Sequence, residues 1–160
     1  DGALFSGGCS PAYIKWGKSI VTGGGGEGGD GEEAGKNPER RAVASVIVAS
    51  LSSDRNAAYA AVRRALAFIL RGEHHDRNRE LAGTSLDRQA LADAVSRADW
   101  DRAEAMIDDE VVRAHSVAGD EAEFAERLGE FGDAGLDCGV LALQGAAEDR
   151  LRALEVAARV

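Results

Sequence analysis

The sequence predicts an α/β fold in which parallel strands are connected by crossover helices. Three segments, residues 2–6, 42–50 and 138–143, are rich in apolar residues and have the length of buried strands. Each of them is followed by a segment whose apolar residues recur with helical spacing. Alternation of strands and helices along a chain is typical of a parallel sheet that is covered by its connecting helices.

The first strand–helix unit occupies the beginning of the chain. The strand at 2–6 is followed by a glycine-containing turn at 7–9. Ser10 is a favourable N-cap and Pro11 a favourable first helical residue, so a helix is expected over 11–22. Its apolar residues form a helical stripe rather than an alternating pattern: Tyr13, Ile14, Trp16, Ile20 and Val21.

Residues 23–35 consist of glycine, glutamate and aspartate apart from one alanine. Because this segment has no apolar face to bury, it is expected to be a flexible, solvated loop. A phosphate-binding glycine loop is the alternative, but a GxGxxG motif requires a strand before it and a helix after it. Here a helix precedes and a strand follows, which favours the flexible loop.

The second unit contains the clearest strand. Residues 42–50 are nearly all apolar or small, the pattern of a parallel strand that is buried on both faces. Ser53 or Asp54 can cap a helix over 55–71, and Gly72 can end it.

Residues 73–116 are polar, helical in pattern and without strand character. Three short helices are expected here, one beginning at Thr84 or Ser85, one around Met106 and one around Val112. The segment is too long for an ordinary connection between a strand and a helix. We therefore predict a helical excursion before the last strand.

The last unit again alternates between helix and strand. A helix that opens at Gly119 or Asp120 and closes at Gly135 leads into the strand at 138–143. A final helix is predicted over 146–160, and its inward residues are expected to be Leu151, Leu154 and Ala158.

Three parallel strands can neither close a barrel of eight nor cover their own edges. The sequence also begins at Asp1, directly before a predicted strand and without the pattern of a signal peptide. We therefore expect residues 1–160 to be part of a single, larger α/β barrel domain.

The charge and the cysteines exclude several classes of protein. A net charge of −9 and the lack of a basic stripe argue against a nucleic-acid partner. No apolar run reaches the length of a membrane span. Cys9 and Cys138 are far apart in sequence and have no neighbouring ligand residues, so two free thiols in a cytoplasmic protein are predicted.

The basic residues are unevenly divided between lysine and arginine. Lys15, Lys18 and Lys36 are the only lysines among 19 basic residues. An acidic, arginine-rich and alanine-rich chain is typical of an organism with a GC-rich genome, and high salt would screen the self-repulsion of such a surface. The composition therefore suits an organism with a GC-rich genome and is compatible with a salt-loving source.

Ligands of parallel barrels bind at the carboxyl ends of the strands, where three loops qualify: 6–10, 50–53 and 143–145. The first loop is the best candidate, because its glycines allow close approach of the backbone and the following helix can present N–H groups to an anion. The candidate cofactor-binding residues are Gly7, Gly8, Cys9 and Ser10. An ordinary turn is the alternative.

His74, His75 and Asp76 suggest a metal site or an acid–base pair. Adjacent histidines cannot share one face of a helix, and no HExxH spacing is present. A solvated loop is therefore favoured and no metal site is predicted. His115, within the helical excursion, is expected to be structural.

Five segments resemble, in order and at similar spacing, motifs of one known family: 1–5 with 10–13, 35–38, 52–64, 117–128 and 133–137. The most specific is VAGDEAEFAERL at 117–128 followed by DAGLD at 133–137, which is similar to an AGTPEEVAERL…DAGVD signature. These motifs belong to the luciferase-like flavin-dependent oxidoreductases. The branch that the chain most resembles contains methylenetetrahydromethanopterin reductases and related proteins that use coenzyme F420.

The resemblance implies a (β/α)8 barrel, to which this chain contributes about the last three strands. It implies hydride transfer between coenzyme F420, or alternatively FMN, and a small organic substrate. It also implies a homo-oligomeric parent protein whose catalytic residues lie mostly upstream, so that the segment alone would be inactive.

Two other functions are considered beside this oxidoreductase. The acidic glycine loop and the amphipathic helices of 86–115 would also suit a non-catalytic, acidic helical interaction module. That alternative requires that 42–50 and 138–143 are not neighbouring parallel strands. A metal hydrolase using His74, His75 and Asp76 is the third possibility and would require a bound metal ion.

Overall fold

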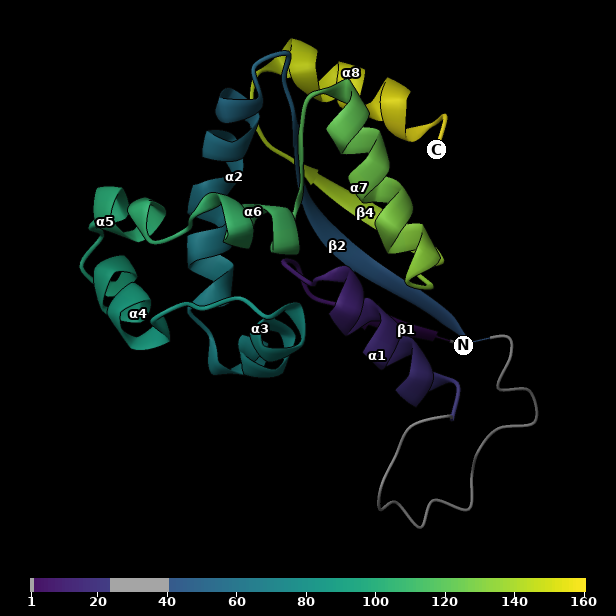
Figure 1. Ribbon diagram of the computed structural model, residues 1–160, viewed down its shortest axis with the longest axis horizontal. Helices are drawn as coiled ribbons and strands as arrows, with labels where there is room; N and C mark the ends of the chain where they lie inside the picture. Colours follow the sequence, from purple (N-terminus) through teal and green to yellow (C-terminus); the bar gives the residue numbers. More distant parts are fainter. Residues whose placement is uncertain (1, 24–40) are drawn as a thin grey trace.

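A computed structural model describes residues 2–23 and 41–160 (Figure 1). Except for Gly23, the predicted glycine loop at 23–35 lies outside these residues. The strands are β1 (Gly2–Phe5), β2 (Ala42–Leu51), β3 (Val117–Gly119) and β4 (Cys138–Leu143). The helices are α1 (Pro11–Val21), α2 (Arg55–Leu70), α3 (Asp76–Ala82), α4 (Arg88–Ser96), α5 (Trp100–Ala105), α6 (Asp109–His115), α7 (Glu121–Asp133) and α8 (Ala147–Ala157), with a 3₁₀ turn, η2 (Glu73–His75), before α3.

The sheet is parallel throughout and is built around β2. β4 lies on one side of β2, with Ala44 opposite Cys138 and Ala49 opposite Leu143. β1 and β3 both lie on the other side, where β1 pairs with the first part of β2 and β3 with its last three residues. The predicted parallel arrangement of 2–6, 42–50 and 138–143 is confirmed.

The sequence predicts three strands, whereas the sheet of the described residues has four, because Val117–Gly119 forms the additional strand β3. This strand is only three residues long and fully buried. It lies between Ser116 and the N-cap Asp120, so it is too short to show any alternation in the sequence. Tertiary pairing with the end of β2, rather than local propensity, produces it.

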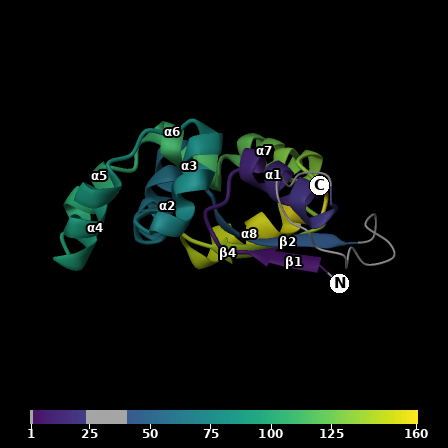
Figure 2. The same ribbon diagram turned by 90° about the horizontal axis from the view of Figure 1, so that it is seen from below.

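Two apolar cores flank the sheet. One lies between β2 and the helices α1, α7 and α8, and is built from residues such as Ile14, Ile47, Leu51, Phe124 and Phe131. The other lies between α2, α4, α5 and α6, and contains residues such as Val48, Leu66, Leu91 and Val112. Figure 2 shows α1 and α7 on one side of β1 and β2.

The opposite side of the first half of the sheet is open. Leu4 of β1 is 70% exposed and Val140 of β4 is 51% exposed. Leu4 lies opposite Ala44 of β2, and Val140 lies opposite Val46. Because residues two apart on a strand point to the same face of the sheet, Leu4 and Val140 lie on one face. This face is apolar and uncovered in the described part of the chain.

The predicted inward face of the last helix was wrong. Leu151 and Leu154 are 66% and 51% exposed, and Ala158 is exposed as well. The residues that pack into the core are Ala153 and Val156. A side chain as small as Ala153 lets the helix axis approach the sheet closely, and the larger leucines on the neighbouring stripe then point outward.

Candidate functional site

A cavity of about 460 Å³ lies beside the carboxyl end of β1. The loop after β1 contributes Ser6 and Gly7, and the segment that ends α2 and forms η2 contributes most of the remaining wall. Its lining residues are Ser6, Gly7, Phe68, Ile69, Arg71, Gly72, Glu73, His74, His75 and Ala92. Two of the candidate segments chosen from the sequence, 6–10 and 74–76, therefore meet at one place.

The loop after β1 turns inward at Gly8. Gly7 is half-buried at the cavity wall, whereas Gly8, Cys9 and Ser10 are buried. Gly8 has a φ of +74°, a conformation that glycine adopts without strain. A Cβ atom at this position would lie 3.0 Å from Cγ2 of Ile69. Of the four candidate cofactor residues, Gly7 is thus the one that lines the cavity.

Ser10 and Cys9 use their polar groups within the protein. The Ser10 hydroxyl caps α1 by accepting from the Tyr13 N–H at 3.2 Å. The thiol of Cys9 donates to the carbonyl oxygen of Ser6 at 3.0 Å, and burial raises the pKa of this thiol to about 11. Cys9 is therefore protonated at neutral pH and is not a nucleophile.

The buried side chain of Asn78 holds the same loop from the helical excursion. Its Oδ1 accepts from the N–H of Ser10 at 2.9 Å and from the Ser10 hydroxyl at 3.0 Å, and its Nδ2 donates to the carbonyl of Gly8 at 2.7 Å. His115 Nδ1 lies 2.9 Å from that same carbonyl oxygen, and its Nε2 lies 2.9 Å from Oγ1 of Thr84. Sequence reasoning missed Asn78, because an asparagine in a polar helical segment gives no signal of long-range contacts.

The two adjacent histidines have different environments. Their ring centroids are 4.3 Å apart, but His75 is buried and His74 is exposed at the cavity. Burial, reinforced by the neighbouring His74, lowers the pKa of His75 to about 4, so it is neutral at physiological pH. His74 is the side chain of this pair that is exposed at the cavity.

Asp76, the third residue of that motif, does not join the histidines. Its carboxylate pairs with Arg79 and lies 3.7 Å from Nε of Arg88. Within residues 2–23 and 41–160, no group of three or more His, Cys, Asp or Glu side chains is arranged to hold a metal ion.

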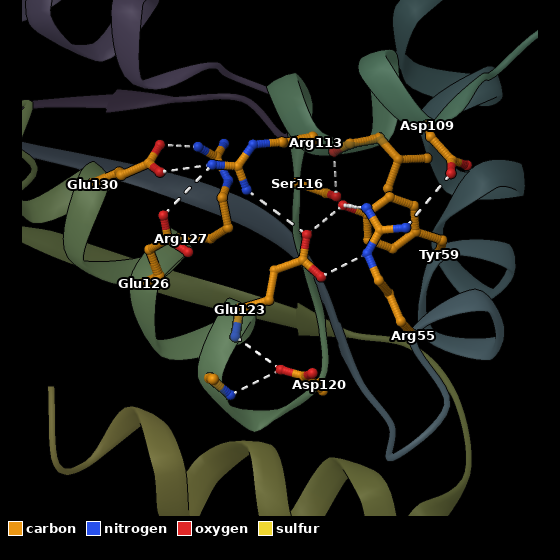
Figure 3. Close-up of polar contacts among 12 residues, drawn as sticks. Arg55, Tyr59, Asp109, Arg113, Ser116, Asp120, Glu123, Glu126, Arg127 and Glu130 are labelled. Carbon is orange, nitrogen blue, oxygen red and sulfur yellow. Dashed lines mark hydrogen bonds and ion pairs between the residues drawn. The ribbon is translucent and has the colours of Figure 1, made fainter.

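A second polar cluster ties the beginning of α2 to the beginning of α7 (Figure 3). The Tyr59 hydroxyl donates to Glu123 at 2.6 Å and accepts from Arg55 at 2.8 Å, while Nε of Arg55 lies 3.0 Å from Glu123. Burial, followed by the hydrogen bond to Glu123, raises the pKa of Tyr59 to about 12. Arg113 adds a further contact to Glu123 at 3.7 Å. Because these groups satisfy one another, we assign this cluster a structural role.

The other two strand-end loops do not line the cavity. Ser52 donates its N–H to the carbonyl of Gly119, which fixes the turn after β2. Gln144 donates its backbone N–H to Ala49 at 2.8 Å and its side-chain amide to Ala142 at 3.1 Å. In the described chain both loops are held by main-chain contacts of the sheet.

A parallel sheet with a cavity at the carboxyl end of a strand is the arrangement expected of an α/β chain, and α/β barrels place their ligands at this end. The family model described as luciferase-like monooxygenase matches residues 30–138. The chain belongs to the luciferase-like monooxygenase family.

The fold is similar to that of a solved structure, the coenzyme F420-dependent tetrahydromethanopterin reductase from Methanopyrus kandleri, with a TM-score of 0.74 and 22% identity. The alignment covers 95% of this chain and 42% of the reductase chain. This agreement confirms the predicted fold class, an α/β chain with the arrangement of part of a barrel. No curated protein matches the sequence. No helix in the described part is both long and apolar enough to span a membrane.

Proposed function

We propose that the protein carrying this chain is an oxidoreductase that moves a hydride between coenzyme F420 and a small organic substrate, with FMN as the alternative cofactor. Membership of the luciferase-like family and the fold shared with an F420-dependent reductase support this proposal. The observation that carries it for this chain is the cavity at the end of β1, where the loop after β1 lies beside Phe68, Arg71 and His74.

The residues at this cavity suit a planar, ring-containing and anionic cofactor. Phe68 is exposed and offers an apolar ring face, and Arg71 lies over that ring with its guanidinium carbon 3.7 Å from the centroid. Gly7 leaves backbone accessible at the wall, since it carries no side chain. A deazaflavin or flavin would supply the hydride chemistry when bound.

The roles proposed for the residues of this chain are binding and orientation. Gly7 would contact the cofactor through its backbone, and Arg71 would attract its negatively charged part. Gly8, Cys9 and Ser10, which the sequence also suggested for the cofactor, would support Gly7 by fixing the path of the loop. His74 would donate or accept a hydrogen bond at the cavity mouth.

The interaction-module alternative fails its own condition. It required that the strands at 42–50 and 138–143 are not neighbours, whereas β2 and β4 pair in parallel over six residues. The metal-hydrolase alternative relied on His74, His75 and Asp76, but the carboxylate of Asp76 is engaged by arginines.

Cofactor titration tests the proposal. Coenzyme F420 and FMN are each titrated into the full-length protein, and their fluorescence reports binding. We expect one of them to bind, and Arg71→Ala to weaken it about tenfold, since a charge-assisted contact is lost. Arg97→Ala is the control, because Arg97 is an exposed arginine that does not line the cavity. If neither cofactor binds, or if both variants behave alike, the assignment of this cavity is wrong.

We also propose that the full-length protein is a cytoplasmic homo-oligomer. The two thiols, Cys9 and Cys138, are both free, in keeping with a reducing compartment. Sedimentation of the native protein measures the oligomeric state, and a monomer at micromolar concentration contradicts this part of the proposal.

A further inference from the structure

Two side chains from the helical excursion converge on one peptide group of the loop after β1. Gly8 offers its carbonyl oxygen to Nδ2 of Asn78 at 2.7 Å and to Nδ1 of His115 at 2.9 Å. Asn78 is fully buried, and it lies 70 residues from Gly8 in sequence, whereas His115 lies 107 residues away. The loop therefore depends on a distant segment for its conformation.

The contacts at Gly8 assign the hydrogen atoms of both side chains. A carbonyl oxygen only accepts, so the 2.9 Å contact places the hydrogen on Nδ1 of His115, and the longer 3.3 Å approach of Asn78 Nδ2 to Nδ1 is then not a hydrogen bond. Nε2 is left as an acceptor 2.9 Å from the hydroxyl of Thr84, which also lies 3.4 Å from the carbonyl oxygen of Arg79. The N–H of Ser10 only donates, so the atom of Asn78 that it meets is the amide oxygen. Burial lowers the pKa of His115 to about 4, so this neutral tautomer is retained through the physiological range.

The contacts at Gly8 affect the cavity through the backbone of the loop. Gly8 has a positive φ, and a peptide group beside glycine can rotate at little cost in the absence of other contacts. Two donors aimed at its carbonyl select one orientation. The Gly8 carbonyl belongs to the peptide group between Gly8 and Cys9, so the two donors hold this peptide group in place. Gly7, the preceding residue, lines the cavity, and its backbone is positioned through Gly8, whose φ is +74° in the held loop.

We propose that Asn78 and His115 are positioning residues, which act through Gly8 to hold the cofactor-facing backbone of Gly7 in one orientation. This inference rests on the proposed function for the identity of the ligand, but the holding of the loop is a property of the chain itself.

A matched pair of substitutions at His115 tests it. In His115→Asn the side-chain amide can take the place of Nδ1 and still donate to Gly8, whereas the contact to Thr84 is lost. In His115→Gln the amide reaches the place of Nε2, so the contact to Thr84 is kept and the donor to Gly8 is lost. Each variant removes one hydrogen bond, so a merely structural role predicts similar effects from both.

Two readouts are measured on the full-length protein. Amide hydrogen exchange follows the segment 7–10, and fluorescence titration follows whichever of coenzyme F420 and FMN binds the unchanged protein. We expect His115→Gln to speed exchange in this segment and to weaken cofactor binding about tenfold, the value of one net hydrogen bond. We expect His115→Asn to stay within about twofold of the unchanged protein in both readouts, since it keeps that bond.

Asn78→Asp provides an independent check. It keeps the oxygen that accepts from Ser10 but places a second oxygen against the carbonyl of Gly8, so it should behave like His115→Gln. Equal exchange and equal affinity in both His115 variants would overturn the inference. Failure of the unchanged protein to bind either cofactor would instead refute the proposed function, while the exchange comparison would still decide whether the two residues hold the loop.

Discussion

Acid should destabilise this protein through two buried histidines. The pKa values of His75 and His115 are each lowered by burial from 6.5 to about 4 in the folded chain. In the unfolded chain both side chains take up a proton below about pH 6.5. Between pH 6.5 and 4 the unfolded state therefore binds more protons, so the free energy of unfolding falls as the pH falls through this window.

The expected size of the effect follows from these pKa values. At pH 5 the unfolded histidine is almost fully protonated and the folded one almost fully neutral. Each of the two residues then costs the folded state about 2 kcal/mol relative to pH 7.5, or roughly 4 kcal/mol together. That is a large part of the roughly 5–15 kcal/mol that stabilises a typical domain.

Urea unfolding at pH 7.5 and at pH 5 measures the difference, provided that the transition is two-state at both values. His115→Gln removes one of the two titrating groups, so its loss between the two pH values should be about half that of the unchanged protein. The reasoning is refuted if the unchanged protein is equally stable at both pH values. It is also refuted if His115→Gln retains the full pH dependence.

Three further predictions concern stability and association. Tyr59→Phe should lower the free energy of unfolding by about 1–3 kcal/mol, because it removes the hydrogen bond from the hydroxyl of the buried Tyr59 to the charged carboxylate of Glu123, and the urea midpoint reports the loss. Gly8→Ala should lower the melting temperature, since its φ is +74°, whereas Gly129→Ala, in open space within α7, should preserve or raise it; equal melting temperatures would contradict this. A polypeptide of residues 1–160 should associate through its open sheet face, and Leu4→Lys with Val140→Lys should return it to a monomer by sedimentation.

The sequence was sufficient to predict the elements that rest on local signals. The strand at 42–50 was evident because a buried parallel strand is apolar on both faces. Ser10 was recognisable as a helix cap, and for the second helix the sequence offered Ser53 or Asp54, of which the structure uses Asp54. In the structure both side chains accept from backbone N–H groups of the first turn. Local chemistry determines such features, so a single sequence is enough to find them.

The features that were missed depend on contacts between distant segments. β3 exists because Val117–Gly119 pairs with the end of β2, and the three residues carry no strand pattern of their own. The burial of Ala153 and Val156 in α8 depends on how closely this helix approaches the sheet. Helical spacing fits the stripe of Leu151 and Leu154 as well as the stripe of Ala153 and Val156, so spacing alone could not identify the buried face.

Gly8→Val would not separate cofactor binding from folding. A β-branched side chain at a φ of +74° is strained, and its Cβ would lie 3.0 Å from Cγ2 of Ile69. Substitution would therefore damage folding together with any binding. Gly8 supports the site through its backbone, and its partners Asn78 and His115 are the residues at which the two effects can be separated.

The loop after β1, residues 6–10, depends on the helical excursion for its conformation. A loop with two adjacent glycines gains much conformational freedom on unfolding, so it does not hold one shape by itself. Asn78 of α3 and His115 of α6 supply the contacts that fix it, and His74 of the adjoining η2 turn lines the same cavity. Changes in the excursion should therefore reach the cavity through these hydrogen bonds, even where the changed residue touches no ligand.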